Sequence, residues 1–307
     1  MIKVGVIGVG SIGRHHARIY AEMKNATLAG IVDHDIARAR ELASKYNCKA
    51  YKDHMGMMDE VDAVSIAVPT TLHYKVAMDF LKHGKDILVE KPITSTLQEA
   101  DDLISEAERR GLIIQVGHLE RFNSGVSLIS SMVEKPSFIE SQRLSPFLGR
   151  GIDVDVTLDL MIHDIDIILS LVNSDIVDIR ATGASVLTDN IDVAHAWIEF
   201  ENGCIAEAVT SRMAEEKKRQ LKVFQHDAFL NLDYQNQEVT CVRRHGAEVK
   251  SEKLKAETKE PLKEELISFI DSVINRTAPV VSGHAGKEAL KIALKVSELV
   301  RRENRKT

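Results

Sequence analysis

A glycine-rich turn between an apolar strand and a helix is the feature that most constrains the fold of this chain. The strand covers residues 2–7, the turn reads Gly-Val-Gly-Ser-Ile-Gly over residues 8–13, and a helical pattern follows. Gly8 allows a tight turn, Gly10 keeps the backbone clear for a phosphate, and Gly13 lets the helix approach the sheet. This order predicts the first unit of an open parallel α/β sheet.

The same turn predicts a dinucleotide site. The amides and the positive dipole end of a helix N-terminus favour a pyrophosphate, which places Ser11 and Ile12 in the predicted phosphate-binding turn. A second apolar strand, residues 27–32, ends in Asp33, where a carboxylate accepts hydrogen bonds from the adenosine ribose. A glycine turn without a ligand is the alternative.

The acid at the end of the second strand also bears on the choice of cofactor. Asp33 would repel a 2′-phosphate, so NAD is favoured over NADP. Asp35, Arg38 and Arg40 lie nearby and leave that choice open.

Length and composition place the chain among two-domain globular proteins. Its 307 residues are long for one core, and the net charge of −6 argues against nucleic acid as a partner. The three cysteines, Cys48, Cys204 and Cys241, show no C-x-x-C spacing, which suggests neither disulfides nor a thiolate metal site. The chain shows no secretory leader and no apolar run near 18 residues, so we expect a cytoplasmic protein with no membrane partner.

Strands and helices alternate through the first third of the chain, as in a parallel sheet covered on both faces. The predicted strands are 61–68, 86–89 and 112–116, and the predicted helices are 73–83 and 96–110. We therefore expect an N-terminal Rossmann dinucleotide-binding domain over residues 1–118.

Consecutive strands dominate the remainder, residues 119–307, and predict an α+β domain with a mostly antiparallel open sheet. The predicted strands are 137–144, 194–200, 204–211, 218–225, 228–234 and 238–243, and the predicted helices are 122–134, 155–172, 262–275 and 286–302. The last helix is also a candidate to pack back on the first domain.

Lys91 follows the buried strand 86–89, within the sequence Glu90-Lys91-Pro92. Ligands of open parallel sheets bind outside the carboxyl ends of the strands, so this position predicts that Lys91 faces the cofactor. Pro92 favours an extended backbone before it and allows a cis peptide bond. A solvated surface charge is the alternative for an isolated lysine.

An acid and a histidine lie four residues apart in the predicted helix 155–172. Asp159 and His163 share a helical face, where the carboxylate would orient the imidazole and stabilise it after it accepts a proton. An ordinary helix ion pair is the alternative. The neighbouring Asp164 and Asp166 are expected to face solvent or the helix end.

The segment Gly-His-Leu-Glu-Arg-Phe-Asn, residues 117–123, leaves the last strand of the first domain and includes His118 and Glu120. Arg121 and Asn123 suit an anionic or hydroxylated substrate, because guanidinium groups bind phosphate and amides bind sugar hydroxyls. The segment is a candidate for substrate binding. Capping between domains is the alternative, and a buried core histidine is the alternative for His118.

The remaining histidines, including His15 and His16, show no metal-ligand spacing, so no catalytic metal is predicted. The chemistry is then left to a nicotinamide cofactor and to acid–base side chains. In that case His163 or Lys91 removes a hydroxyl proton while the carbinol hydride leaves for nicotinamide C4.

Taken together, these motifs resemble the glucose-fructose oxidoreductase, inositol dehydrogenase and MocA (Gfo/Idh/MocA) family. The matching segments are residues 8–13, 68–70 with His73, 90–92, 159–166, 261–266 and 282–283. The resemblance implies a C-terminal sheet at which subunits associate as a dimer or tetramer, and a catalytic trio that maps onto Lys91, Asp159 and His163. It also implies that Pro69, Thr70 and His73 line the nicotinamide and that residues 90–92 close over it.

The segment 117–123 resembles that of family members that oxidise the 3-hydroxyl of UDP-N-acetylglucosamine to a ketone. Met161 departs from the family, in which many members carry glycine, and is expected to narrow the substrate cleft. The resemblance implies NAD-dependent oxidation of a nucleotide sugar. The alternatives are a free polyol or sugar dehydrogenase of the inositol 2-dehydrogenase type and a non-catalytic ligand sensor, against which the retained acid–base trio argues.

Overall fold

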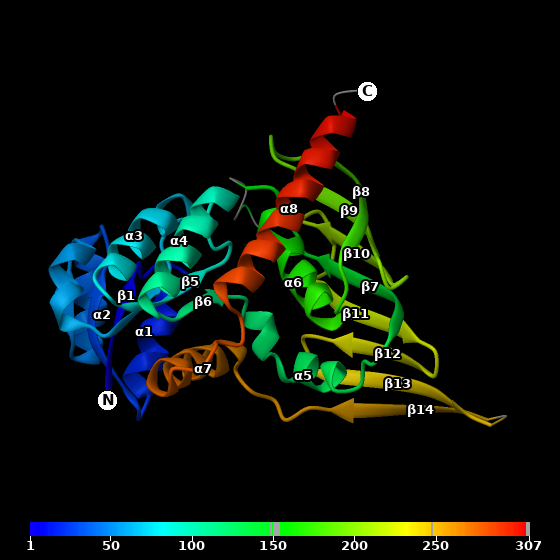
Figure 1. The fold of residues 1–307 in the computed structure, drawn as a ribbon, viewed down its shortest axis with the longest axis horizontal. Helices are drawn as coiled ribbons and strands as arrows, with labels where there is room; N and C mark the ends of the chain where they lie inside the picture. The colour runs from blue at the N-terminus through cyan, green and yellow to red at the C-terminus, as the bar shows by residue number, and fades with distance from the viewer. Residues whose placement is uncertain (148, 150–153, 247, 305–307) are drawn as a thin grey trace. The chain divides into compact units, whose positions relative to one another are not determined.

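The chain folds into two compact units (Figure 1), and the computed structural model describes residues 1–147, 149, 154–246 and 248–304. The first unit comprises Met1–Leu119 and Glu260–Lys287, and the second comprises Glu120–Lys259 and Glu288–Thr307. The polypeptide therefore leaves the first unit, returns to it near the C-terminus and leaves it again.

The described residues of the first unit form a six-stranded parallel sheet in the order β3-β2-β1-β4-β5-β6. Its strands are β1 Ile2–Ile7, β2 Ala26–Val32, β3 Lys49–Tyr51, β4 Ala63–Ile66, β5 Asp86–Glu90 and β6 Ile114–Gly117. Its helices are α1 Gly13–Glu22, α2 Ile36–Tyr46, α3 Thr70–Lys82, α4 Leu97–Arg110 and α7 Pro261–Asn275, with the short helix η1 His54–Glu60. The strand order reverses between β1 and β4, which is where sheets of this type bind ligands. The predicted Rossmann architecture is confirmed.

Local sequence signals account for the ends of these helices. Thr96 accepts a hydrogen bond from the Glu99 amide while the Glu99 side chain bonds back to the Thr96 amide, and this capping box starts α4. Gly111 ends the helix in the left-handed conformation, with φ of 64°. Asp35 caps α2 by accepting from the amides of Ala37 and Arg38.

Residues 260–287 pack with the first unit, although the sequence analysis assigned all of 119–307 to the second domain. The apolar face of α7 joins the core that α1 shares with the sheet, through Leu262, Leu266, Phe269, Ile270 and Val273. Arg276 then ties the end of α7 to Asp86 of β5 at 2.6 Å. The sequence predicted the helix but gave no signal of which sheet would bury its face.

The described residues of the second unit form an eight-stranded sheet in the order β14-β13-β12-β11-β7-β10-β9-β8, antiparallel except for the parallel pair β7 and β10. Its strands are β7 Pro136–Leu144, β8 Ile176–Ala184, β9 Val193–Phe200, β10 Ile205–Ser211, β11 Lys218–Gln225, β12 Ala228–Asp233, β13 Glu238–His245 and β14 Glu248–Lys255. The predicted mostly antiparallel sheet is therefore confirmed.

Three helices cover one face of this sheet: α5 Ser124–Ser130, α6 Ile162–Leu171 and α8 Gly283–Asn304 (Figure 1). One face of α8 belongs to the core of this unit, through Ala289, Ile292, Ala293, Val296 and Val300. Arg301 pairs with Asp155 at 2.7 Å. The helix was a candidate to pack back on the first domain, and its first residues, Gly283–Lys287, do belong to the first unit, where Lys287 contacts Asp101 at 2.5 Å.

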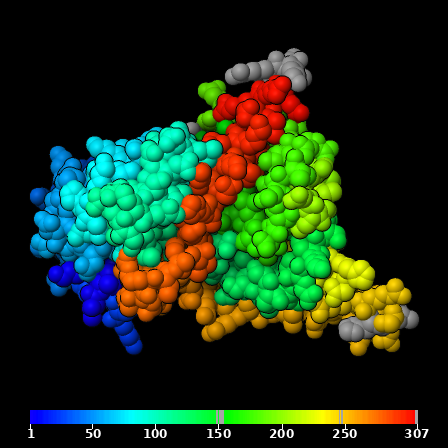
Figure 2. Space-filling model, in the orientation of Figure 1, coloured from blue at the N-terminus to red at the C-terminus, as the bar shows by residue number. Residues whose placement is uncertain are grey.

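In the first unit the sequence analysis did not identify the short strand β3 or the helix α2, and in the second unit it missed two strands and overextended one helix. β8 is an edge strand without clean alternation, and β14 is exposed and polar on both faces, so neither carries the period-two pattern of a half-buried strand. Figure 2 shows the hairpin of β13 and β14 extending from the rest of its unit. The predicted helix 122–134 is shortened to α5, preceded by the short helix η2 Leu119–Phe122.

Candidate functional site

The three glycines of the first turn differ in what a side chain would meet there. Gly8 has φ of +84°, and a Cβ on it would lie 2.7 Å from the Ala67 carbonyl oxygen. A Cβ on Gly13 would lie 1.9 Å from the Gly8 carbonyl oxygen. At Gly10 a Cβ would meet no described atom within 4 Å. Gly8 and Gly13 are therefore required by the fold, whereas the fold leaves the space beside Gly10 open.

Asp33 is buried at the end of β2, beside this turn. Its Oδ2 accepts a hydrogen bond from the Val9 amide at 2.9 Å, and its Oδ1 accepts one from the Asp35 amide at 2.9 Å. His34 Nδ1 lies 3.1 Å from Oδ1, and Arg38 Nη1 lies 3.6 Å from Oδ2. The two amide bonds fix the carboxylate at the mouth of the turn, where lone pairs remain for a ligand.

A dinucleotide fits these features. Helix α1 begins at Gly13, and its N-cap, Ile12, has no side-chain acceptor for the first amides. Those amides favour an anion, and the open space beside Gly10 leaves room for one. Ser11 and Ile12 lie in the same turn, so the predicted phosphate-binding residues are contiguous in the structure.

Glu90 and Lys91 lie at the carboxyl end of β5, and the Lys91–Pro92 peptide bond is cis, as the sequence allowed. The Glu90 carboxylate is buried and lies 3.2 Å from His16 Nε2 of α1. His16 Nδ1 lies 3.1 Å from the Ser65 hydroxyl, which is 2.9 Å from the Tyr20 hydroxyl. A series of polar contacts through the core therefore positions Glu90, the residue that precedes Lys91 in the sequence.

The environment of Glu90 keeps it ionised. Burial alone would raise the pKa of its carboxyl, but the proximity of His16, with Lys91 and His73, outweighs burial and lowers the pKa. Gly117, opposite Glu90 on β6, makes room for it, since a Cβ there would lie 2.9 Å from Glu90 Oε2.

Pro69, Thr70 and His73 form the start of α3, with Pro69 as its N-cap. His73 is buried, and its ring nitrogens each lie 2.9 Å from a carbonyl oxygen, Nδ1 from that of Pro92 and Nε2 from that of Val68. Burial lowers the pKa of His73, against the opposing effect of the two carbonyls and Glu90. His73 therefore connects the start of α3 to the loop that carries Lys91.

In the second unit, Asp159 lies in a one-turn π-helix, η3 Thr157–Met161, that leads into α6. Asp159 is half-buried and His163, in the first turn of α6, is buried. Single π turns within helices recur at functional sites. Met161 is fully buried in the hydrophobic core of the unit, so its side chain does not narrow a cleft as the sequence analysis expected.

The prediction that Asp164 and Asp166 face solvent or the helix end is wrong. Asp164 is 1% exposed, and its two oxygens accept hydrogen bonds from Arg143 Nε and Nη2 at 2.8 and 3.0 Å. Asp166 is 3% exposed and lies 3.7 Å from Arg121 Nη1. Helix α6 is covered on nearly all sides, so even its carboxylates are buried and require cationic partners.

In this structure, side chains of the predicted substrate-binding segment bond to other residues of the chain. Glu120 Oε1 accepts hydrogen bonds from Arg143 and Arg219 at 3.0 and 3.3 Å. Asn123 caps α5 through the Gly125 amide and donates to Glu120 and to the Tyr234 carbonyl. His118 is buried at the end of β6. The contacts of Glu120 and Asn123 lie within the second unit, and the role of the segment in substrate binding stays a prediction.

Sequence reasoning missed the partners of these groups. His16 was set aside for want of metal spacing, although a histidine and a tyrosine four residues apart on the inner face of α1 are a signal for a buried polar pair. Arg143, Arg219 and Tyr234 lie on or beside predicted strands and carried no motif.

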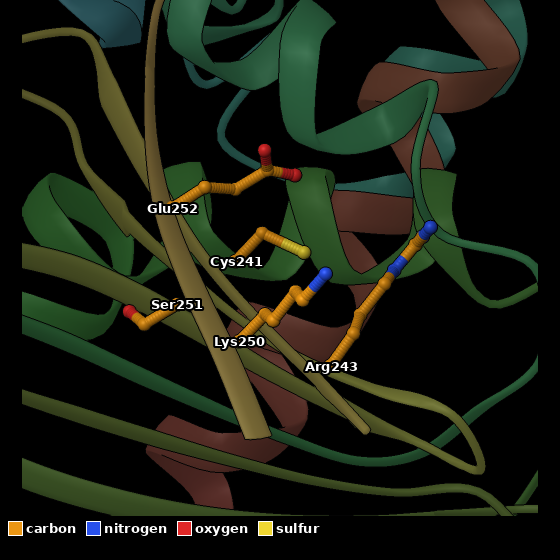
Figure 3. A pocket seen from close by; sticks show the side chains of 5 residues that line it. All are labelled: Cys241, Arg243, Lys250, Ser251 and Glu252. Atoms are coloured by element: carbon orange, nitrogen blue, oxygen red, sulfur yellow. The ribbon is translucent and has the colours of Figure 1, made fainter. Parts of the chain in front are cut away.

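A hollow of about 340 Å³ lies on β13 and β14, lined by Cys241, Arg243, Lys250, Ser251 and Glu252 (Figure 3). It contains none of the predicted site residues, and we assign it no role. Within the described ranges, no helix has the length and apolar character needed to span a membrane.

Models of one protein family match both units of the chain. The Gfo/Idh/MocA oxidoreductase family, with an NAD-binding Rossmann fold, matches residues 2–118, and the Gfo/Idh/MocA C-terminal domain matches residues 135–229. These matches cover the turn, Asp33 and Lys91 in the first unit, and Asp159 and His163 in the second.

Individual relatives agree with the family match. The chain is 35% identical over 302 residues to UDP-N-acetylglucosamine 3-dehydrogenase of Acidithiobacillus ferrooxidans, covering 96% of each protein. A solved structure of that enzyme, GnnA, superposes with a TM-score of 0.93 over 97% of both chains. Myo-inositol 2-dehydrogenase of Thermotoga maritima is 27% identical over 94% of this chain and 93% of its own. The chain therefore belongs to the Gfo/Idh/MocA family of oxidoreductases.

Proposed function

We propose that this protein oxidises the 3-hydroxyl of UDP-N-acetylglucosamine to a ketone with NAD as the hydride acceptor. The observation that carries the proposal is the 35% identity to an enzyme of that name over nearly the whole length of both chains. A shared fold alone would not carry it, because one fold serves many reactions.

The catalytic groups in this proposal are Lys91, Asp159 and His163. When bound, NAD accepts the hydride that leaves the carbinol carbon. The hydroxyl proton passes to His163 or Lys91, so that the C–H and O–H bonds break and a C=O bond forms. Asp159 orients His163 and stabilises its protonated form. Pro69, Thr70 and His73 support the nicotinamide side through the start of α3.

NAD rather than NADP is the proposed cofactor because Asp33 lies where the adenosine ribose would bind. Its carboxylate is fixed by two amides and would repel a 2′-phosphate. Arg38 faces Asp33 and Asp35 and is partly neutralised by them. Replacing Asp33 by serine should free Arg38 and raise the ratio of NADP to NAD affinity, measured by fluorescence titration. An unchanged ratio would contradict this role of Asp33.

The substrate is tested by following NADH absorbance with UDP-N-acetylglucosamine and, separately, with myo-inositol. We expect turnover of the nucleotide sugar, and turnover of inositol alone would refute the proposal. Lys91→Met should abolish turnover and leave NAD binding within a few-fold, because the phosphate-binding turn is untouched. A variant that turns over sugar normally would show that Lys91 is not catalytic.

We also propose that the protein is a cytoplasmic homo-oligomer that associates through the second sheet. Phe138, Trp197, Phe224 and Phe229 form a chain of ring contacts with centroids 4.9 to 6.0 Å apart, and Phe224 is 37% exposed. Apolar side chains on a sheet face favour association. Light scattering after size exclusion tests this, and replacement of Phe224 by aspartate should shift the oligomer towards monomer.

A further inference from the structure

Two arginines face each other across neighbouring strands of the second sheet. Arg143 of β7 pairs directly with Arg219 of β11 in the antiparallel register. Like charges directly opposite each other destabilise a sheet. Both guanidinium groups reach Oε1 of Glu120, at 3.0 and 3.3 Å, so one carboxylate oxygen is shared between two cations.

The charges around this pair do not balance. Arg143 is bound by both oxygens of Asp164, and Glu120 is the one carboxylate within 4 Å of Arg219 among the described residues. Lys217 lies close enough that Arg219 and Arg143 both lower its pKa, with Arg219 the larger cause. Three cations therefore face two carboxylates, which leaves one positive charge in excess.

The excess charge lies towards the surface. Arg143 is 2% exposed, the Arg219 side chain is one-third exposed, and Lys217 is exposed in the loop before β11. Glu215 and Glu216 precede Lys217 in that loop and are exposed as Lys217 is, but among the described residues no ion pair joins either of them to Lys217 or Arg219. Arg219 and Lys217 are thus open to a ligand from solvent, while Arg143 is not.

A buried hydroxyl beside the same charges also lacks a partner. Tyr234 is 3% exposed, and its hydroxyl has no hydrogen-bond partner among the described residues. Its ring lies 5.3 Å from the Arg143 guanidinium. Burial, with Asp164 and Glu120 and against Arg143, raises the pKa of the hydroxyl, so it stays protonated. Buried polar groups are normally paired, so an unpaired one beside surplus cations indicates a site completed by a ligand.

The cluster lies next to a predicted catalytic residue in the same unit. Asp164, which binds Arg143, directly follows His163 in the first turn of α6. Arg219 is thus linked through Glu120 and Arg143 to the first turn of α6, which carries His163.

We infer that Arg219 and Lys217 bind a phosphate group of the substrate, with Arg143 and Glu120 holding Arg219 in place. The inference rests on the proposed function, since the diphosphate of a nucleotide sugar supplies this group. A sugar monophosphate carries the same chemistry. Guanidinium groups bind phosphate oxygens through paired N–H donors, and lysine adds a point charge.

The test is calorimetric titration of the NAD-bound protein and its Arg219→Gln, Lys217→Gln and Lys218→Gln variants. The ligands are UDP-N-acetylglucosamine, UDP, glucose 6-phosphate, myo-inositol and free N-acetylglucosamine. Lys218 is the matched control, because it is exposed and alternation in the strand directs it away from the face of Arg219. Arg219→Gln removes a like-charge pair and leaves Glu120 bound to Arg143, so the thermal midpoint should stay within a few degrees of wild type.

We expect Arg219→Gln to weaken binding of both UDP ligands about tenfold or more, and Lys217→Gln to weaken it less. Lys218→Gln should bind the UDP ligands like wild type. The affinity for free N-acetylglucosamine should be the same in wild type and in all three variants. Equal UDP affinity in wild type and the Arg219 and Lys217 variants would overturn the inference and leave the proposed function standing.

The ligand panel separates the two proposals. If wild type binds glucose 6-phosphate but no UDP ligand, and the Arg219 and Lys217 variants lose that binding, the phosphate site is supported and the nucleotide-sugar substrate is refuted. If wild type binds inositol and none of the phosphate-bearing ligands, both proposals fail.

Discussion

Replacing Gly10 by alanine should separate cofactor binding from folding. A Cβ there meets no described atom within 4 Å, and φ of Gly10 lies outside the left-handed region, so alanine fits the backbone. A glycine-to-alanine change at such a position stabilises the folded state by about 0.4–1 kcal/mol through the unfolded chain. Without cofactor, the variant should therefore melt at or slightly above the wild-type temperature.

The substitution should weaken NAD binding, because the new methyl group occupies the space left for the pyrophosphate. At a concentration 100 times the dissociation constant, a ligand stabilises the folded state by about 2.7 kcal/mol. If the methyl weakens binding about 100-fold, the same concentration gives only about 0.4 kcal/mol. Differential scanning fluorimetry with and without NAD measures both quantities.

Gly13→Ala is the matched control in the same turn. Its Cβ would lie 1.9 Å from the Gly8 carbonyl oxygen, so the backbone has to move. Overpacking of this kind costs about 1–3 kcal/mol, and the cofactor-free protein should melt several degrees lower. The reasoning is refuted if Gly10→Ala lowers the cofactor-free melting temperature as Gly13→Ala does, or if it keeps the full NAD-induced shift.

Three further substitutions test other parts of the structure. Asp164→Asn should lower stability by about 3–5 kcal/mol in urea unfolding because it leaves Arg143 poorly compensated in the core, whereas exposed Asp189→Asn should have little effect. Burial opposes the ionisation of Asp192, but backbone amides and a hydroxyl outweigh it and lower its pKa to about 2. Ionised Asp192 should therefore add about 2 kcal/mol to the free energy of unfolding above pH 4, and this contribution should be lost towards pH 2. Asp192→Asn should flatten the dependence of the free energy of unfolding on pH in that range, and an unchanged slope would contradict this. His163→Gln should lower kcat at least about 100-fold without weakening NAD binding, and a smaller loss would contradict a role as proton acceptor.

The first unit was predictable because its signals are local. Apolar strands, the three glycines and Asp33 lie within about thirty residues, and each is constrained by neighbours in the sequence. The position of Lys91 followed from the rule that places ligands at the carboxyl ends of parallel strands. The assignment of α7 could not follow, because an amphipathic helix does not specify which of two sheets buries its face.

The second unit was predictable in type and not in detail. Alternating strands such as β9 were found, but the exposed β14 has no buried face to produce a pattern. The burial of Asp164 depends on Arg143, 21 residues away on a strand, and no spacing rule connects a helix residue to a strand partner. The π turn at Asp159 is a departure from helical geometry that apolar periodicity does not detect.

Transfer of the sugar C3 hydrogen to the cofactor is the most direct test of the central claim. The measurement is mass spectrometry of the reduced cofactor after reaction of the wild-type enzyme with NAD and UDP-N-acetylglucosamine that carries deuterium at C3. We expect NADH heavier by one mass unit, and no such product in the Lys91→Met variant. Unlabelled NADH, or no NADH from this sugar, would contradict it.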